Sequence, residues 1–90
     1  MSVADSIREK LTRTLAPGSL EIVDESARHA GHVGARPEGE THFRVRVVSD
    51  LFRGQSRIAR QRLVHDVLAE ELRTRVHALS LVTLTPEEAE

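Results

Sequence analysis

Two histidine-bearing segments hold the residues of this chain best suited to chemistry. His77 lies in Val76-His77-Ala78-Leu79, and His29 and His32 lie three residues apart in a glycine-containing stretch. Imidazole is the commonest side-chain metal ligand and binds in its neutral form, so binding should weaken as pH falls toward roughly 6. The chain has five histidines and no cysteine. Any thiolate ligand must therefore come from another molecule, which favours a partner-dependent protein over a self-contained enzyme.

The composition limits the chain to one small domain. Its 90 residues carry 13 basic and 14 acidic side chains, so general attraction to nucleic acid or to an anionic membrane is not expected. We find no signal peptide and no apolar run long enough for a membrane span, and we expect a cytoplasmic protein without a membrane partner. The only aromatic residues are Phe43 and Phe52, and Phe43 has a core pattern. This argues against a nucleic-acid binder that stacks bases.

Hydrophobic periodicity and capping signals predict an alternation of helices and strands. In chain order we expect a helix over 3–15, a strand over 20–25, a polar loop over 27–40, a strand over 41–49, a turn over 50–55, a helix capped by Ser56 that continues to Leu72, a strand over 79–84 and a helical stub from Thr85.

This order, α-β-β-α-β-(α), predicts a small α+β domain over residues 1–90. The first two strands should pair antiparallel, and the strand–helix–strand passage should place the third strand parallel to its partner. Helices then cover one face of a three-stranded mixed sheet. In the second strand, alternation directs Phe43, Val45 and Val47 to the core and leaves His42 on the outer face.

A basic cluster consists of four arginines in the turn and the second helix, namely Arg53, Arg57, Arg60 and Arg62. No acidic residue interrupts it until Asp66. Taken alone, such a cluster is typical of a solvated helix face, but it also suits a nucleic-acid patch or a docking surface for an acidic partner and glutathione carboxylates. RNA binding of the KH type needs a Gly-x-x-Gly loop. In this chain Arg57 stands three residues after Gly54, where the second glycine would be.

Several separate sequence blocks occur in the order that is typical of one protein family. They are Asp24-Glu25-Ser26 followed by His29, Thr41-His42-Phe43-Arg44-Val45, Phe52-Arg53-Gly54-Gln55-Ser56, Arg60-Gln61-Arg62, Leu68-Ala69-Glu70-Glu71-Leu72 and Val76-His77-Ala78-Leu79. Over residues 7–86 the chain resembles the BolA family. The resemblance implies a class II KH-like fold. The family commonly has histidine where this chain has Gln61, so no role of that histidine is carried over.

The resemblance also implies a partner and a cofactor. BolA-like proteins pair with monothiol glutaredoxins and share a [2Fe-2S] cluster at the interface, where the glutaredoxin cysteine and glutathione supply thiolates. The ligands from the BolA-like side map to His77 and His29, with His32 as a substitute. Two imidazoles also replace two thiolates on one iron in Rieske centres. We expect no cluster on the isolated chain.

Each histidine also has a plainer interpretation. His77 shares strand parity with the leucines that follow it, so it could be a buried histidine bonded to the backbone, and His29 and His32 could be solvated loop residues. The resemblance instead implies that His77 sits just before the regular strand and is exposed. We assign no metal role to His42 or His65.

The sequence favours a binding or regulatory function over catalysis. Nucleophilic chemistry lacks a cysteine, and there is no P-loop, dinucleotide fingerprint or His-Glu-x-x-His motif. The resemblance predicts an iron–sulfur assembly, trafficking or iron-sensing factor that forms a heterodimer with a monothiol glutaredoxin. The alternative is a DNA-binding transcriptional regulator that uses the arginine cluster, since the family includes such members. A structural adaptor that binds without metal is a third possibility.

Overall fold

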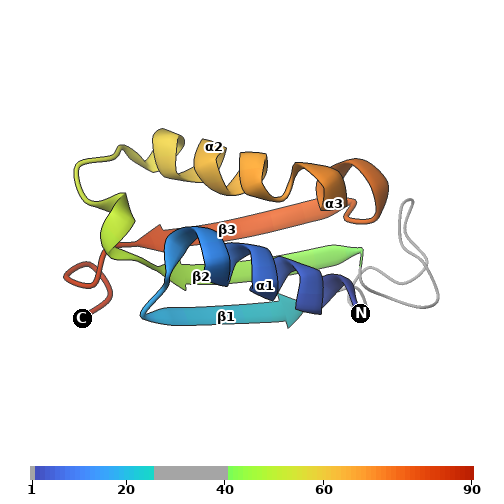
Figure 1. The fold of residues 1–90 in the computed structure, drawn as a ribbon, viewed down its shortest axis with the longest axis horizontal. Helices are drawn as coiled ribbons and strands as arrows, with labels where there is room; N and C mark the ends of the chain where they lie inside the picture. Colours follow the sequence, from blue (N-terminus) through green and yellow to red (C-terminus); the bar gives the residue numbers. More distant parts are fainter. Residues whose placement is uncertain (1, 26–40) are drawn as a thin grey trace.

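The structure is a computed structural model that describes residues 2–25 and 41–90. Its elements are helix α1 (Val3–Leu15), strand β1 (Ser19–Asp24), strand β2 (His42–Val48), 3-10 helix η2 (Asp50–Phe52), helices α2 (Arg57–Val67) and α3 (Ala69–Thr74), and strand β3 (Ala78–Leu84). Figure 1 shows the helices packed along a single sheet. The loop predicted over 27–40 lies outside the described residues. No helix among the described residues has the length and apolar character needed to cross a membrane.

The sheet has the predicted topology. Its order is β1-β2-β3, with β1 antiparallel and β3 parallel to the central strand β2. The register places Ile22, Val45 and Leu81 side by side across the three strands. Because side chains alternate between faces, this row and its neighbours Phe43 and Val47 form the apolar face that packs under the helices. The predicted α+β class with a three-stranded mixed sheet is confirmed.

Helix α1 is fixed by signals in its own sequence. The Ser2 hydroxyl accepts the Asp5 N–H at 3.0 Å, and the Asp5 carboxylate accepts the Ser2 N–H at 3.4 Å, which completes a capping box. Four apolar residues at every fourth position are buried, namely Val3, Ile7, Leu11 and Leu15. The helix ends at Ala16, which adopts a left-handed conformation with φ 42° immediately before Pro17. Both ends of this helix were predicted correctly.

The second helical region begins as predicted but divides in two. The Ser56 hydroxyl accepts the Ala59 N–H at 3.1 Å and starts α2. The helix predicted to run on to Leu72 is interrupted at Leu68, whose φ of −101° and ψ of 17° leave the α-helical range. Leu68 remains in the core at 1% exposure. The break redirects the chain so that α3 approaches α1.

The helical stub predicted from Thr85 is wrong, because residues 86–89 form a turn. Two capping contacts are present: the Glu88 carboxylate accepts the Thr85 N–H at 2.8 Å, and the Thr85 hydroxyl accepts the Glu88 N–H at 3.3 Å. However, one α-type backbone bond follows, from the Ala89 N–H to the Thr85 carbonyl at 3.1 Å. A cap without further turns does not propagate a helix, because nucleation fixes several residues for each hydrogen bond gained.

Candidate functional site

His77 is exposed at the point where the chain passes from α3 into β3. Its backbone N–H donates to the Thr41 carbonyl at 2.7 Å, and the N–H of Ala78 donates to the same oxygen at 3.1 Å. These two bonds dock the segment against the start of β2. The structure therefore places His77 at the surface, as the resemblance implies, and not inside the core.

The segment before His77 is held from the other side by α3. The N–H groups of Arg75 and Val76 both donate to the Glu71 carbonyl, at 2.8 and 2.7 Å, and Val76 is buried at 5% exposure. The Glu71 side chain pairs with Lys10 of α1 at 2.8 Å. An ion pair and a buried valine thus fix the backbone that carries the exposed imidazole.

His42 is not open to solvent, although strand alternation places it on the face opposite Phe43. It is 7% exposed, and its Nδ1 lies 2.9 Å from the Thr41 hydroxyl. Its ring centroid lies 5.4 Å from that of His77, with the ring planes 50° apart. The alternation of side chains along β2 holds no information about its neighbours. The parallel pairing of β2 with β3 brings His77 against the His42 ring. Sequence periodicity carries no signal for that contact.

The other predicted ligands, His29 and His32, lie outside the described residues. Within residues 2–25 and 41–90, no group of three or more His, Cys, Asp or Glu side chains could hold a metal ion. In that part of the chain the structure brings together His77 and His42. It leaves His65 apart on the exposed surface of α2.

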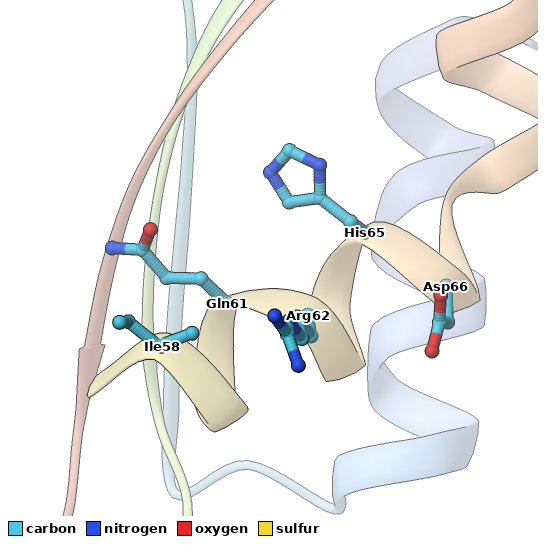
Figure 2. Close-up of a pocket in the computed structure, with 5 residues that line it drawn as sticks. All are labelled: Ile58, Gln61, Arg62, His65 and Asp66. Carbon is cyan, nitrogen blue, oxygen red and sulfur yellow. The ribbon is translucent and has the colours of Figure 1, made fainter. Parts of the chain in front are cut away.

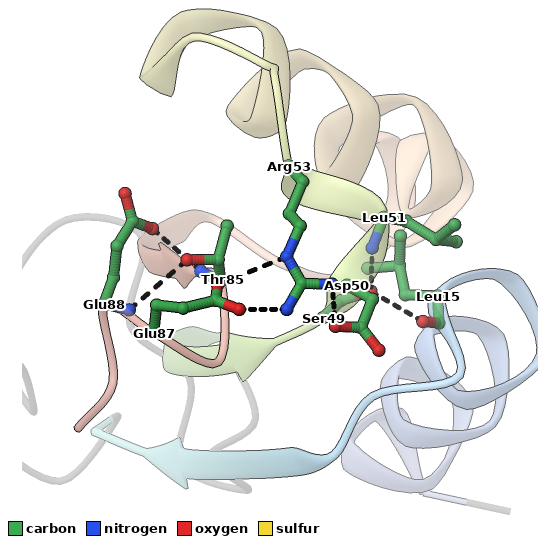
Figure 3. Close-up of polar contacts among 8 residues, drawn as sticks. All are labelled: Leu15, Ser49, Asp50, Leu51, Arg53, Thr85, Glu87 and Glu88. Atoms are coloured by element: carbon green, nitrogen blue, oxygen red, sulfur yellow. Dashed lines mark hydrogen bonds and ion pairs between the residues drawn. The ribbon is translucent and has the colours of Figure 1, made fainter.

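The arginine cluster is divided by acidic residues that are distant in the sequence. Arg53 lies between two carboxylates, contacting Asp50 at 2.5 Å and forming two hydrogen bonds with Glu87 from the C-terminal turn (Figure 3). The hydrogen bonds from Arg53 lower the pKa of Glu87. No acidic residue separates the four arginines in the sequence, but in the fold Arg53 pairs with acids from outside that stretch.

Arg60 is a structural residue of the same region. Its guanidinium donates to the carbonyls of Gln55 and Thr83, at 3.0 and 3.1 Å, and to the Glu88 carboxylate at 2.6 Å. It also lies over the Phe52 ring, 5.8 Å from the centroid. Its hydrogen bond and those from Thr85 lower the pKa of Glu88 to about 2. With 11% of its side chain exposed, Arg60 offers little surface to a ligand.

Arg57 and Arg62 are exposed and make no ion pair with any described residue. Arg62 borders a shallow hollow of about 280 Å³ on the outer surface of α2. Figure 2 shows Gln61 and His65 projecting from the same side of this helix, one turn apart. The free cations of the cluster are therefore two of the four predicted arginines.

Neither phenylalanine adds a stacking surface. Phe43 is 2% exposed and Phe52 is fully buried, and the chain has no Trp or Tyr.

The two candidate surfaces, one around His77 and the other around the arginine cluster, lie at opposite ends of the sheet. His77 precedes the first residue of β3, whereas the C-terminal turn follows its last residue. Figure 1 shows the start of α2 and the C-terminal turn at one end of the sheet and α3 at the other. Seven strand residues separate the two surfaces, a span of about 20 Å.

The model of the BolA-like protein family matches residues 11–88 of this chain. SufE-like protein 1 of Arabidopsis thaliana is 50% identical over 86 residues, which cover 91% of this chain and 23% of that protein. Chloroplastic BOLA1 of the same plant is 49% identical over 88 residues, covering 96% of this chain and 55% of that protein. The chain thus spans less than two thirds of the length of these two relatives.

A bacterial relative matches over four fifths of its length, and two solved structures match over nearly their whole length. The DNA-binding transcriptional regulator BolA of Escherichia coli is 46% identical over 90 residues, covering 100% of this chain and 82% of that protein. The BolA domain of SufE1 from A. thaliana superimposes with a TM-score of 0.87 at 49% identity, over 98% of this chain and 96% of that chain. BolA1 from A. thaliana gives 0.85 at 45% identity, over 97% and 95%. The chain belongs to the BolA-like protein family.

Proposed function

We propose that this protein is a cytoplasmic, non-enzymatic iron–sulfur factor that forms a heterodimer with a monothiol glutaredoxin. The observation that carries the proposal is the exposed His77, which two hydrogen bonds to the Thr41 carbonyl hold at the surface. An exposed imidazole in a chain without cysteine suits an incomplete metal site that a thiolate-bearing partner completes. Its output is cluster transfer or the sensing of iron status.

The proposed ligand set is the one that the family resemblance implies. His77 and His29, with His32 as the substitute, supply nitrogen ligands to one iron of a [2Fe-2S] cluster, and the glutaredoxin cysteine and glutathione supply sulfur. Imidazole fits this role because it replaces thiolate on one iron of Rieske centres, where it raises the reduction potential. In the described residues no complete metal site accompanies His77, and the remaining ligands come from His29 and the partner.

The test is anaerobic cluster reconstitution of the protein with a monothiol glutaredoxin and glutathione, followed by visible absorption, circular dichroism and size exclusion. We expect a coloured 1:1 heterodimer with a spectrum distinct from that of the glutaredoxin alone. His77→Ala should abolish or weaken that spectrum while the fold is retained. His65→Ala removes another exposed histidine and should leave the spectrum unchanged.

Three results would contradict this proposal or redirect it. An unchanged spectrum for His77→Ala would exclude His77 as a ligand. A tight but colourless complex would indicate a structural adaptor that binds glutaredoxin without metal. No complex and no spectral change would leave the arginines of α2 as the functional surface.

The second candidate function is DNA binding. It is favoured by the E. coli relative, which is named a DNA-binding transcriptional regulator, and by the exposed Arg57 and Arg62, which form no ion pair with residues 2–25 or 41–90. Because no aromatic ring is available for stacking, the expected target is the phosphate backbone of a duplex. Salt-dependent mobility shifts of duplex DNA would support it, and their absence even at low salt would exclude it.

A further inference from the structure

Thr41 and His42 form a buried polar pair at the start of β2, directly beside His77. Thr41 is 1% exposed and His42 is 7% exposed. The Thr41 hydroxyl lies 2.9 Å from His42 Nδ1, within hydrogen-bonding distance. A buried hydrogen bond of this kind restricts the His42 ring to one orientation, because rotation would leave a polar atom without its partner.

Thr41 also fixes the backbone of the opposing segment. Its carbonyl accepts the N–H groups of both His77 and Ala78, at 2.7 and 3.1 Å. The same residue therefore holds the His42 ring through its side chain and the His77 backbone through its main chain. One buried residue, immediately before the central strand, therefore contacts both histidines.

The imidazole rings of His42 and His77 lie next to each other, beside Thr41. Their centroids are 5.4 Å apart and their planes are tilted by 50°, a separation within the range of favourable aromatic pairs. His77 is exposed whereas His42 is buried, so an exposed ring lies against a buried one. We propose that His42, held by Thr41, is a positioning residue that orients the His77 imidazole for ligation.

This inference rests on the proposed role of His77 as a cluster ligand. Histidine ligands are normally oriented by neighbouring groups, and loss of such a group lowers metal affinity by roughly 10- to 100-fold. A freely rotating imidazole loses side-chain entropy when it binds, whereas a ring already held in place loses less. The buried pair gives an exposed histidine this advantage.

The first test uses the isolated protein and needs no cluster. Side-chain NMR relaxation should show that the His77 ring is more ordered than the ring of His65, an exposed histidine with no aromatic neighbour among the described residues. In His42→Ala the order of the His77 ring should fall toward that of His65, and its ring-proton shifts should change as the neighbouring ring current disappears. A His77 ring as mobile as that of His65, or unchanged in a folded His42→Ala variant, would overturn the proposal.

Thr41 provides a second pair of variants in case His42→Ala unfolds. Thr41→Val removes the hydroxyl and keeps the carbonyl, whereas Thr41→Ser keeps both. We expect Thr41→Val to loosen the His77 ring and Thr41→Ser to behave as the wild type. Equal ring order in the two variants would contradict the role of the hydroxyl, and with it the positioning mechanism.

The same variants are then compared in the reconstituted glutaredoxin complex. We expect His42→Ala and Thr41→Val to weaken binding of the shared cluster roughly 10- to 100-fold and to alter its circular dichroism, and Thr41→Ser to preserve both. If the wild type forms no cluster, the proposed function fails while the NMR result still decides the positioning. If the wild type forms a cluster that His42→Ala leaves unchanged, the positioning role alone fails.

Discussion

Arg60 of α2 and Glu88 of the C-terminal turn form an ion pair at 2.6 Å across 28 residues of sequence. Glu88 also accepts the Thr85 N–H at 2.8 Å, and Arg60 also donates to the carbonyl of Thr83 in β3 at 3.1 Å. The pair therefore joins a helix, the edge of the sheet and the turn that follows it. We therefore expect the ion pair to stabilise this end of the domain.

The stability that this pair provides should depend on pH in the acid range. The pKa of Glu88 is lowered from 4.5 to about 2, chiefly by the Arg60 hydrogen bond. A carboxyl whose pKa is lower in the folded state stabilises the fold above its unfolded pKa and loses that effect as pH falls through the folded value. Urea unfolding should therefore show wild type more stable than Glu88→Gln by a constant amount above pH 5, with the difference disappearing between about pH 4.5 and 2.

The control for this experiment is Glu21→Gln, which removes an exposed carboxylate on β1. A difference between wild type and Glu88→Gln that persists unchanged at pH 2 would show that the ion pair is not its source. In that case the lost backbone cap at Thr85 would account for the effect.

The ion pair between Lys10 and Glu71 should stabilise the domain more than an exposed pair on the same helix. Lys10 and Glu71 meet at 2.8 Å with side-chain exposures of 33% and 10%, whereas Glu9 and Arg13 pair at 48% and 70% exposure. Glu71→Gln should lower the free energy of unfolding by about 1 to 2 kcal/mol, and Glu9→Gln by about 0.5 kcal/mol or less. Chemical denaturation compares the two. Equal losses would indicate that the link between α1 and α3 adds no stability.

Two isoleucines on helices provide a matched test of the core. Ile7 of α1 is fully buried, and Ile58 of α2 is 66% exposed. Ile7→Ala leaves a cavity between α1 and the sheet and should cost about 2 to 5 kcal/mol, whereas Ile58→Ala should change stability by about 0.5 kcal/mol or less. Thermal and urea unfolding measure both. A large loss for Ile58→Ala would mean that this side chain is covered in solution, for example by a second copy of the protein.

Local signals account for what the sequence predicts well. The capping box at Ser2 and Asp5, the stripe from Val3 to Leu15 and the alternation around Val45 each lie within one helix or one strand, so a short window contains the whole pattern. The surface position of His77 came from the family resemblance, because parity with the leucines of β3 also allowed a buried side chain.

The features that were missed depend on contacts between distant segments. The burial of His42 results from the parallel register that places Ala78 opposite it. The neutralisation of Arg53 results from Glu87, 34 residues away. Neither contact produces a periodic pattern in the sequence. The sequence alone therefore does not show that a distant segment covers His42 or that a distant carboxylate pairs with Arg53. The roles of His29 and His32 stay predictions.

Arg53 provides the sharpest test of the proposed DNA binding, because its guanidinium is paired with two carboxylates in the free protein. Arg53, Asp50 and Glu87 together carry a net charge of −1, so this group should repel phosphate. The double variant Asp50→Asn/Glu87→Gln neutralises both acids. It frees the N–H donors of the Arg53 guanidinium, whose geometry also fits phosphate. One additional phosphate contact should steepen the slope of log affinity against log salt by about 0.9.

Fluorescence anisotropy with duplex DNA at several salt concentrations measures that slope. The control is Asp66→Asn/Glu70→Gln, which removes two exposed charges near α2 without touching Arg53. Because general electrostatic attraction changes equally in both double variants, a steeper slope confined to Asp50→Asn/Glu87→Gln identifies Arg53 as a masked phosphate contact. Equal slopes in the two variants would leave Arg53 as a structural residue of the C-terminal turn and restrict DNA contacts to Arg57 and Arg62.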